Sequence, residues 1–128
     1  MYFIRYTIEY GDVVNAAKKL AVAFYRSSTG AEPVRDWLKA MSPGDRVLMG
    51  RELRVVEMGW PIGMPVCRPL GRGLWEVRCD LTSNRIARVF FCIAQGFMVL
   101  LHGFVKKTRS TPEKELELAR KRQKEVEQ

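Results

Sequence analysis

The sequence has few of the residues that bind metals or form disulfides. Its 128 residues include one histidine, His102, and three cysteines, Cys67, Cys79 and Cys92. The number of cysteines is odd, their spacings are 12 and 13 residues, and no two of them form a C-x-x-C pair. This pattern does not fit a zinc site or a disulfide framework. We therefore expect buried free thiols in a reducing compartment, with no metal and no cofactor.

Long hydrophobic runs are also missing. The most apolar stretch, 89–104, is interrupted by Gln95, Gly96 and His102. It falls short of the roughly 18 apolar residues that a membrane-spanning helix needs. The first residues alternate in polarity and lack the apolar core of a signal peptide. The sequence therefore predicts a cytoplasmic protein with no membrane partner.

Familiar catalytic motifs are absent too, among them G-x-S-x-G, the P-loop and H-E-x-x-H. What the sequence does have is positive charge, with 22 Lys and Arg against 14 Asp and Glu and a formal net charge of +8. The excess is spread along the chain and forms no basic tail. It is least compensated in residues 74–107, which hold five basic and two acidic residues. This balance favours a polyanionic partner, either nucleic acid or an acidic protein.

Two predicted helices follow each other closely in the first half of the chain. Pro33 suits the first turn of a helix whose apolar residues recur at helical spacing up to Met41. Ser42 is placed to cap a second helix that has Pro43 at its first position. Because the connection is so short, the two helices are expected to form an αα-hairpin.

Alternating polarity and short apolar runs predict strands on both sides of this hairpin. They lie at 2–10, 20–25, 66–69, 74–81, 85–94 and 97–105. A polar C-terminal helix, capped by Ser110 or Thr111 and begun by Pro112, resembles a peripheral lid or tail. The length suits one domain with one core. We expect an α+β fold in which an N-terminal strand and the αα-hairpin pack on a twisted antiparallel sheet.

Charged residues on the predicted sheet are candidates for a functional site. Glu76 and Arg78 are two apart and point to the same side of their strand. Arg88 lies inside an apolar strand, so it is either paired or lines a cleft that holds an anion. Arg85 is three residues earlier and points to the opposite face unless a bulge intervenes.

The last strand adds a histidine and two lysines. By alternation, His102 shares a face with Met98, Leu100 and Lys106, and a satisfied core or edge histidine is the alternative to a functional one. Lys106 and Lys107 end the strand, where solvated charge is the alternative.

These residues together suggest a concave basic face. It would hold Arg72, Arg78, Arg88, Lys106 and Lys107, with Glu76 and His102 as proton carriers. Such a face suits a phosphodiester, because cations stabilise the charge that develops on phosphorus and an acid or base moves the protons. No metal is required. The same residues also fit passive anion binding, and spacing alone does not separate the two.

Five ordered blocks of the sequence point to a known family. They are AFYR with EPVRDWL at 23–38, GWPIGMP with RPLG at 59–71, GLWEVR at 73–78, RIARVFF at 85–91, and LLHGFVKKT with TP at 100–112. In this order they resemble the phage-derived, HigB-like branch of the RelE/ParE superfamily, toxins of bacterial type II toxin–antitoxin systems. The resemblance covers about residues 21–125.

The resemblance implies a RelE-like fold and a ribosome-dependent mRNA endonuclease that inhibits translation and is neutralised by an antitoxin, commonly a helix-turn-helix protein. By position, Arg78 and Arg88 would be the sheet arginines, and Lys106 or Lys107 the cation after the last strand. The substrate 2′-OH would be the nucleophile. The C-terminal tyrosine of some relatives is missing, so Glu76 or His102 would have to act as base. The remaining predicted RNA contacts are Arg72, Arg85 and Arg109.

Residues 1–20 lie outside the resemblance and form either an added edge strand or a stretch before the true start. Residues 21–128 are the predicted toxin domain. Two other functions remain open. One is a ParE-like inhibitor of DNA gyrase on the same fold, since fold alone does not fix function. The other is an inactive toxin that acts with its antitoxin as a binding module.

Overall fold

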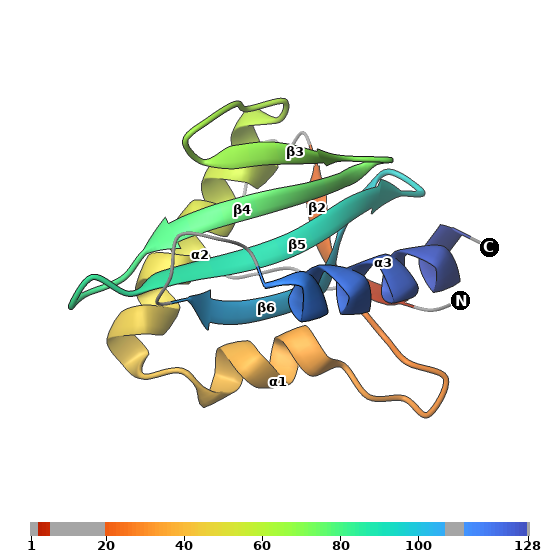
Figure 1. Ribbon diagram of the computed structural model, residues 1–128, viewed down its shortest axis with the longest axis horizontal. Coiled ribbons are helices and arrows are strands. Elements are labelled where there is room, and N and C mark those ends of the chain that lie inside the picture. Colours follow the sequence, from red (N-terminus) through yellow and green to blue (C-terminus); the bar gives the residue numbers. More distant parts are fainter. Residues whose placement is uncertain (1–2, 6–19, 107–111, 128) are drawn as a thin grey trace.

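The computed structural model describes residues 3–5, 20–106 and 112–127, and every structural statement below concerns these residues. They form a six-stranded sheet in the order β1-β2-β6-β5-β4-β3, together with three helices (Figure 1). The strands are β1 (Phe3–Arg5), β2 (Ala21–Tyr25), β3 (Cys67–Gly71), β4 (Leu74–Asp80), β5 (Ile86–Ala94) and β6 (Phe97–Lys106). The helices are α1 (Pro33–Ala40), α2 (Pro43–Gly59) and α3 (Glu113–Glu127). The predicted α+β class is confirmed.

The direction of one strand differs from the prediction. β3, β4, β5 and β6 form the expected antiparallel meander. β2, however, runs parallel to β6, with Ala21 opposite Phe97 and Phe24 opposite Leu100, so the sheet is mixed and not wholly antiparallel. The helical hairpin and the meander separate these two strands along the chain, which gives the long connection that parallel neighbours require. β1 pairs antiparallel with β2 at the sheet edge, and the rest of the strand predicted at 2–10 lies outside the described residues.

The two faces of the sheet are covered by different helices. α2 lies behind the sheet in Figure 1 and α3 lies in front of it. α1 and α2 pack on one core, which includes Val34, Met49 and Leu53 against Val77 and Phe91. α3 packs on a second core on the opposite face. This core includes Leu74, Phe90, Cys92, Val99, Leu101, Ala119 and Val126. The three cysteines are buried and free, and burial raises the pKa of each thiol to about 12.

The αα-hairpin forms as its caps predict. The Ser42 hydroxyl accepts a hydrogen bond from the backbone N–H of Asp45 at 3.3 Å, and Pro43 occupies the first position of α2. α1 then approaches β6 so closely that residue 103 has no room for a side chain. A Cβ built on Gly103 would lie 2.5 Å from the Trp37 ring, well inside van der Waals contact. A glycine is therefore required where Trp37 lies on the sheet.

We predict that Gly103→Ala lowers the free energy of unfolding by about 1–3 kcal/mol, because Trp37 has to move out of its packed position. Thermal or urea denaturation measures the loss. The matched control is Gly44→Ala, since a Cβ at Gly44 has no atom within 4 Å and the residue lies in the first turn of α2. Equal stability of the two variants would show that Trp37 does not fix residue 103.

Polar contacts add to the apolar packing that holds α3 on the sheet. Arg120 donates to the backbone carbonyls of Leu70 at 2.9 Å and Gly71 at 2.8 Å. Arg122 donates to the carbonyl of Leu101 at 2.8 Å and lies over the Tyr25 ring, 5.2 Å from its centroid. The capping residues predicted for this helix, 110 and 111, lie outside the described residues.

A β-bulge changes the side-chain pattern of β6. Phe90 pairs with His102 and Phe91 pairs with Leu100, so Leu101 has no partner in β5. As a result Leu100 packs in the core under α1 and α2, whereas His102 lies on the α3 side of the sheet. The prediction that His102 shares a face with Met98 and Leu100 is therefore wrong, because simple alternation does not survive the extra residue.

Candidate functional site

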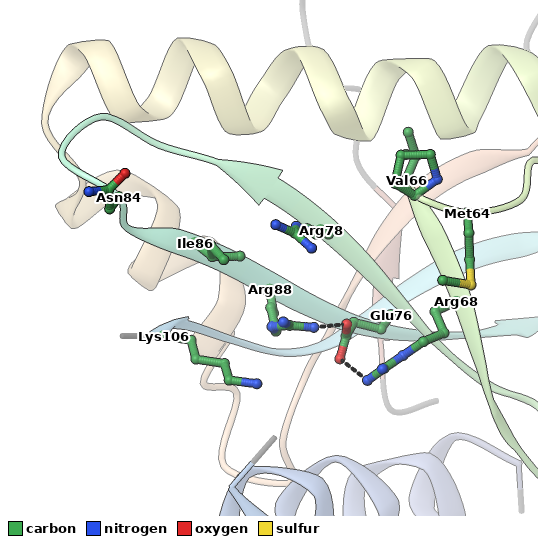
Figure 2. Close-up of a pocket in the computed structure, with 10 residues that line it drawn as sticks. Met64, Val66, Arg68, Glu76, Arg78, Asn84, Ile86, Arg88 and Lys106 are labelled. Atoms are coloured by element: carbon green, nitrogen blue, oxygen red, sulfur yellow. Dashed lines mark hydrogen bonds and ion pairs between the residues drawn. The ribbon is translucent and has the colours of Figure 1, made fainter. Parts of the chain in front are cut away.

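A pocket of about 440 Å³ opens on the α3 side of the sheet (Figure 2). α3 itself covers the other end of this face (Figure 1). Strands β3, β4, β5 and β6 supply its floor, and the segment before β3 and the β4–β5 turn supply its two ends. The lining residues are Met64, Pro65, Val66, Arg68, Glu76, Arg78, Asn84, Ile86, Arg88 and Lys106.

Strand register brings the charged residues together. Arg68 lies opposite Glu76, and Arg78 lies opposite Arg88 on the neighbouring strand. Ile86 lies opposite Lys106 in the adjoining row. Because residues two apart on a strand share a face, all of these side chains reach the same side of the sheet. Cations from four strands, as much as 38 positions apart in the chain, therefore lie together on one face of the sheet.

Arg88 and Glu76 form a buried ion pair at the centre of the pocket. Figure 2 shows Glu76 between two guanidinium groups, with Arg88 on one side and Arg68, at 3.4 Å, on the other. Both members are buried, with side-chain exposures of 8% for Arg88 and 2% for Glu76. The Nε atom of Arg88 is also buried and has no hydrogen-bond partner among the described residues. A buried donor without a partner is costly, and an anion in the pocket would accept from it.

The sequence left two alternatives for Arg88, a paired arginine or one that lines an anion-holding cleft. The arginine is paired, and it also lines a pocket. Glu76 is held between the guanidinium groups of Arg88 and Arg68, and its role as a proton carrier stays a prediction.

Lys106 is the second buried cation of the site, with a relative exposure of 3%. Burial lowers its pKa from the usual 10.5, and the neighbouring charge of Arg88 lowers it further, while Glu76 acts in the opposite direction. The neutral amine is therefore more populated at a given pH than in an ordinary surface lysine. A lysine of this kind can bind an anion when protonated and move a proton when neutral.

Arg78 gives the pocket an accessible charge. Its side chain is 43% exposed and makes a 3.2 Å ion pair with Asp80, which is itself 75% exposed and is not a lining residue. The lining set as a whole contains four cations, Arg68, Arg78, Arg88 and Lys106, against the single carboxylate of Glu76. The pocket is thus strongly attractive to an anion.

Two of the other predicted site residues, His102 and Arg72, lie away from the pocket. His102 is bound to Glu115 of α3 and stacks on Phe104, with ring centroids 5.7 Å apart. Arg72 lies in the β3–β4 turn, where its carbonyl accepts from Gln123 at 2.7 Å. Lys107 and Arg109 lie outside the described residues.

Arg85 points to the opposite face, as its spacing from Arg88 predicted. It makes a bidentate pair with Asp45 of α2 at 2.8 and 3.0 Å. The hydrogen bond from Arg85 holds the pKa of Asp45 below its usual value, and that of Arg85 is raised in turn. Arg85 therefore ties the β4–β5 turn to the helical hairpin and leaves the pocket to other residues.

Several lining residues of the pocket were not predicted from the sequence. Arg68 was not a candidate, although it lies on β3 directly opposite Glu76 of β4. Met64, Pro65 and Val66 were not candidates either, since residue 66 begins a predicted strand and residues 64 and 65 precede it. Apolar residues that line a charged pocket carry no charge of their own, so nothing in the sequence marks them as part of the site.

The described part of the chain holds neither a cluster of metal ligands nor a helix that could span a membrane. Among the described residues, no three His, Cys, Asp or Glu side chains gather closely enough to hold a metal ion. Within the same part of the chain, no helix combines the length and apolar character needed to cross a bilayer.

Fold and pocket define a small α+β domain with a buried cationic site on one face of its sheet. Residues 36–124 match the family described as phage derived protein Gp49-like (DUF891). The chain therefore belongs to this family, which is part of the RelE/ParE-like toxin superfamily. No curated protein matches the sequence.

Proposed function

We propose that the protein is the toxin of a type II toxin–antitoxin system, of the HigB-like branch, and that it cleaves mRNA on the ribosome. The observation that carries this proposal is the buried pair of cations, Arg88 and Lys106, beside an exposed Arg78 in one pocket. Membership of a toxin superfamily supports the same reading. A helix-turn-helix antitoxin is the proposed partner that keeps the enzyme silent.

The chemistry that fits this pocket is attack of a ribose 2′-OH on the adjacent phosphorus. The new bond joins the 2′-oxygen to phosphorus, the bond from phosphorus to the 5′-oxygen breaks, and a 2′,3′-cyclic phosphate and a free 5′-OH result. Arg88 and Arg78 would stabilise the additional negative charge on the phosphoryl oxygens. Because Glu76, which also binds Arg68, holds Arg88 in place, the charge is oriented before the substrate arrives.

Two protons have to move in this reaction, one from the 2′-OH and one to the 5′-oxygen. Glu76 is occupied by two guanidinium groups, and His102 lies outside the pocket on Glu115. Lys106 lines the pocket and has a lowered pKa, so we assign it one of the two transfers. The pocket needs no metal for this chemistry, since its cations supply the charge that a metal would otherwise provide.

We predict that expression without antitoxin arrests growth and that mRNA is cut within translated regions. Primer extension on total RNA from the arrested cells locates the cuts, and Arg88→Ala expressed at the same level is the control. Intact transcripts together with altered plasmid supercoiling would support gyrase inhibition instead. Normal growth together with binding to the antitoxin would support a binding module.

A further inference from the structure

We propose that the pocket holds a whole nucleotide and that a nucleobase next to the scissile phosphate packs on Met64 and Pro65. This inference rests on the proposed function, since it identifies part of the substrate of the same pocket. Met64 and Pro65 then select among RNA sites, while the cations act on every site alike.

The size of the pocket supports the first half of the proposal. At about 440 Å³ it falls within the range of roughly 300–1,000 Å³ typical of small-molecule sites. A water molecule occupies about 30 Å³, so one phosphate group with its oxygens leaves most of this volume unfilled. A ligand that fills the pocket has to carry a larger group beside its phosphate.

The chemistry of the lining shows what that group is. Met64, Pro65, Val66 and Ile86 line the same cavity as the four cations. Met64 is 72% exposed, whereas Cys67, three residues later at the start of β3, is fully buried. The large hydrophobic residues that are also exposed, Val47, Val55, Ile93 and Val105, do not line the pocket. An exposed thioether at the mouth of a cationic pocket suits a flat, apolar face that is covalently joined to an anion.

The positions of these residues separate the two parts of the ligand. Figure 2 shows Met64 and Val66 at the β3 end of the pocket, beside Arg68, with Lys106 on the other side of Arg88. A phosphate bound at Arg88 therefore has the apolar residues farther along the pocket, at its β3 end. Asn84 lies at the opposite end, in the β4–β5 turn. Nucleotides of single-stranded RNA offer this combination of a negative phosphate and a base with an exposed π-face.

Binding of small ligands tests the proposal without any need for cleavage. The probes are inorganic phosphate, ribose 5-phosphate and the four nucleoside 3′-monophosphates, titrated into the folded protein and followed by NMR chemical shifts. We expect at least one nucleotide to bind about fivefold to tenfold more tightly than ribose 5-phosphate, as packing of one base contributes in nucleic-acid sites. Met64→Ala is expected to remove most of this difference and to leave binding of ribose 5-phosphate unchanged.

Matched variants identify the contribution of the methionine. Val47→Ala truncates another exposed apolar residue, on α2 and away from the pocket, and is expected to bind all probes as the wild type does. Met64→Phe keeps an apolar surface and is expected to retain the preference for nucleotides. Arg88→Ala is expected to weaken every phosphate probe. Met64 is exposed, so its variants are expected to fold normally.

Two results would overturn the base site and leave the nuclease proposal intact. One is equal binding of nucleotides and ribose 5-phosphate by the wild type, and the other is an unchanged preference in Met64→Ala. If no phosphate probe binds even though the protein is folded, the cationic pocket itself fails, and the proposed function fails with it.

Discussion

Arg88→Ala is expected to lower the rate of mRNA cleavage by about 10²–10³-fold, the usual effect of removing one oriented donor from a site where negative charge develops. The change removes a buried guanidinium that lines the pocket and whose Nε has no hydrogen-bond partner among the described residues. Cells that express this variant should grow without antitoxin. Cleavage of a reporter mRNA in a translation extract, with purified toxin added, measures the rate.

Controls separate lost chemistry from lost folding. Truncation of Arg88 leaves Glu76 with Arg68 as its remaining arginine partner, and a buried carboxylate that loses a partner destabilises the fold. The double variant Arg88→Ala/Glu76→Gln relieves that charge and should regain stability but not activity. Arg85→Ala removes an arginine of the β4–β5 turn that faces α2, and it should keep full activity. An active Arg88→Ala would contradict the site assignment.

Lys106→Arg is the second variant with a large expected effect. Arginine keeps the positive charge but stays protonated at every accessible pH, so it binds phosphate without moving a proton. We expect cleavage to fall by about 10²–10⁴-fold, the range for loss of a general acid or base. Binding of ribose 5-phosphate should stay close to that of the wild type. Single-turnover cleavage and NMR titration of the same preparation give the two measurements.

The pH dependence of the wild type provides an independent test of Lys106. If the neutral amine accepts the 2′-OH proton, the rate rises with pH and levels off above the pKa of Lys106. Burial and the charge of Arg88 lower this pKa, so the midpoint of the rise should lie below pH 10.5. Lys106→Arg should lose that rise. A variant that keeps both the rate and the pH profile would show that Lys106 acts only through its charge.

Local patterns were sufficient to predict most of the fold. Alternation located β4, β5 and β6, and the Ser42-Pro43 pair located the start of α2. Alternation does not specify which strands become neighbours, so the parallel pairing of β2 with β6 was not foreseen. The attachment of α3 was missed for a similar reason, because Arg120 and Arg122 bind main-chain carbonyls that are present whatever the sequence.

Prediction of the site depended on how unusual each residue is in its surroundings. Arg88 was identified because an arginine in an apolar strand requires a partner, and the structure provides one in Glu76. His102 was placed on the wrong face because the bulge at Leu101 leaves no clear mark in the sequence. Met64 looked like an ordinary loop residue, and only the tertiary structure brings it to a cationic pocket.

The bulge has a consequence for how β6 can change during evolution. Removing one residue from a strand normally turns every later side chain to the wrong face. In β6 the residue without a partner is Leu101, so its loss would restore a regular ladder with Leu100 opposite Phe91 and His102 opposite Phe90. Lys106 would still reach the pocket, and Gly103 would still lie under Trp37. The cost would fall on the core beneath α3, where Leu101 is buried, so chain length at this point can vary separately from the chemistry of the site.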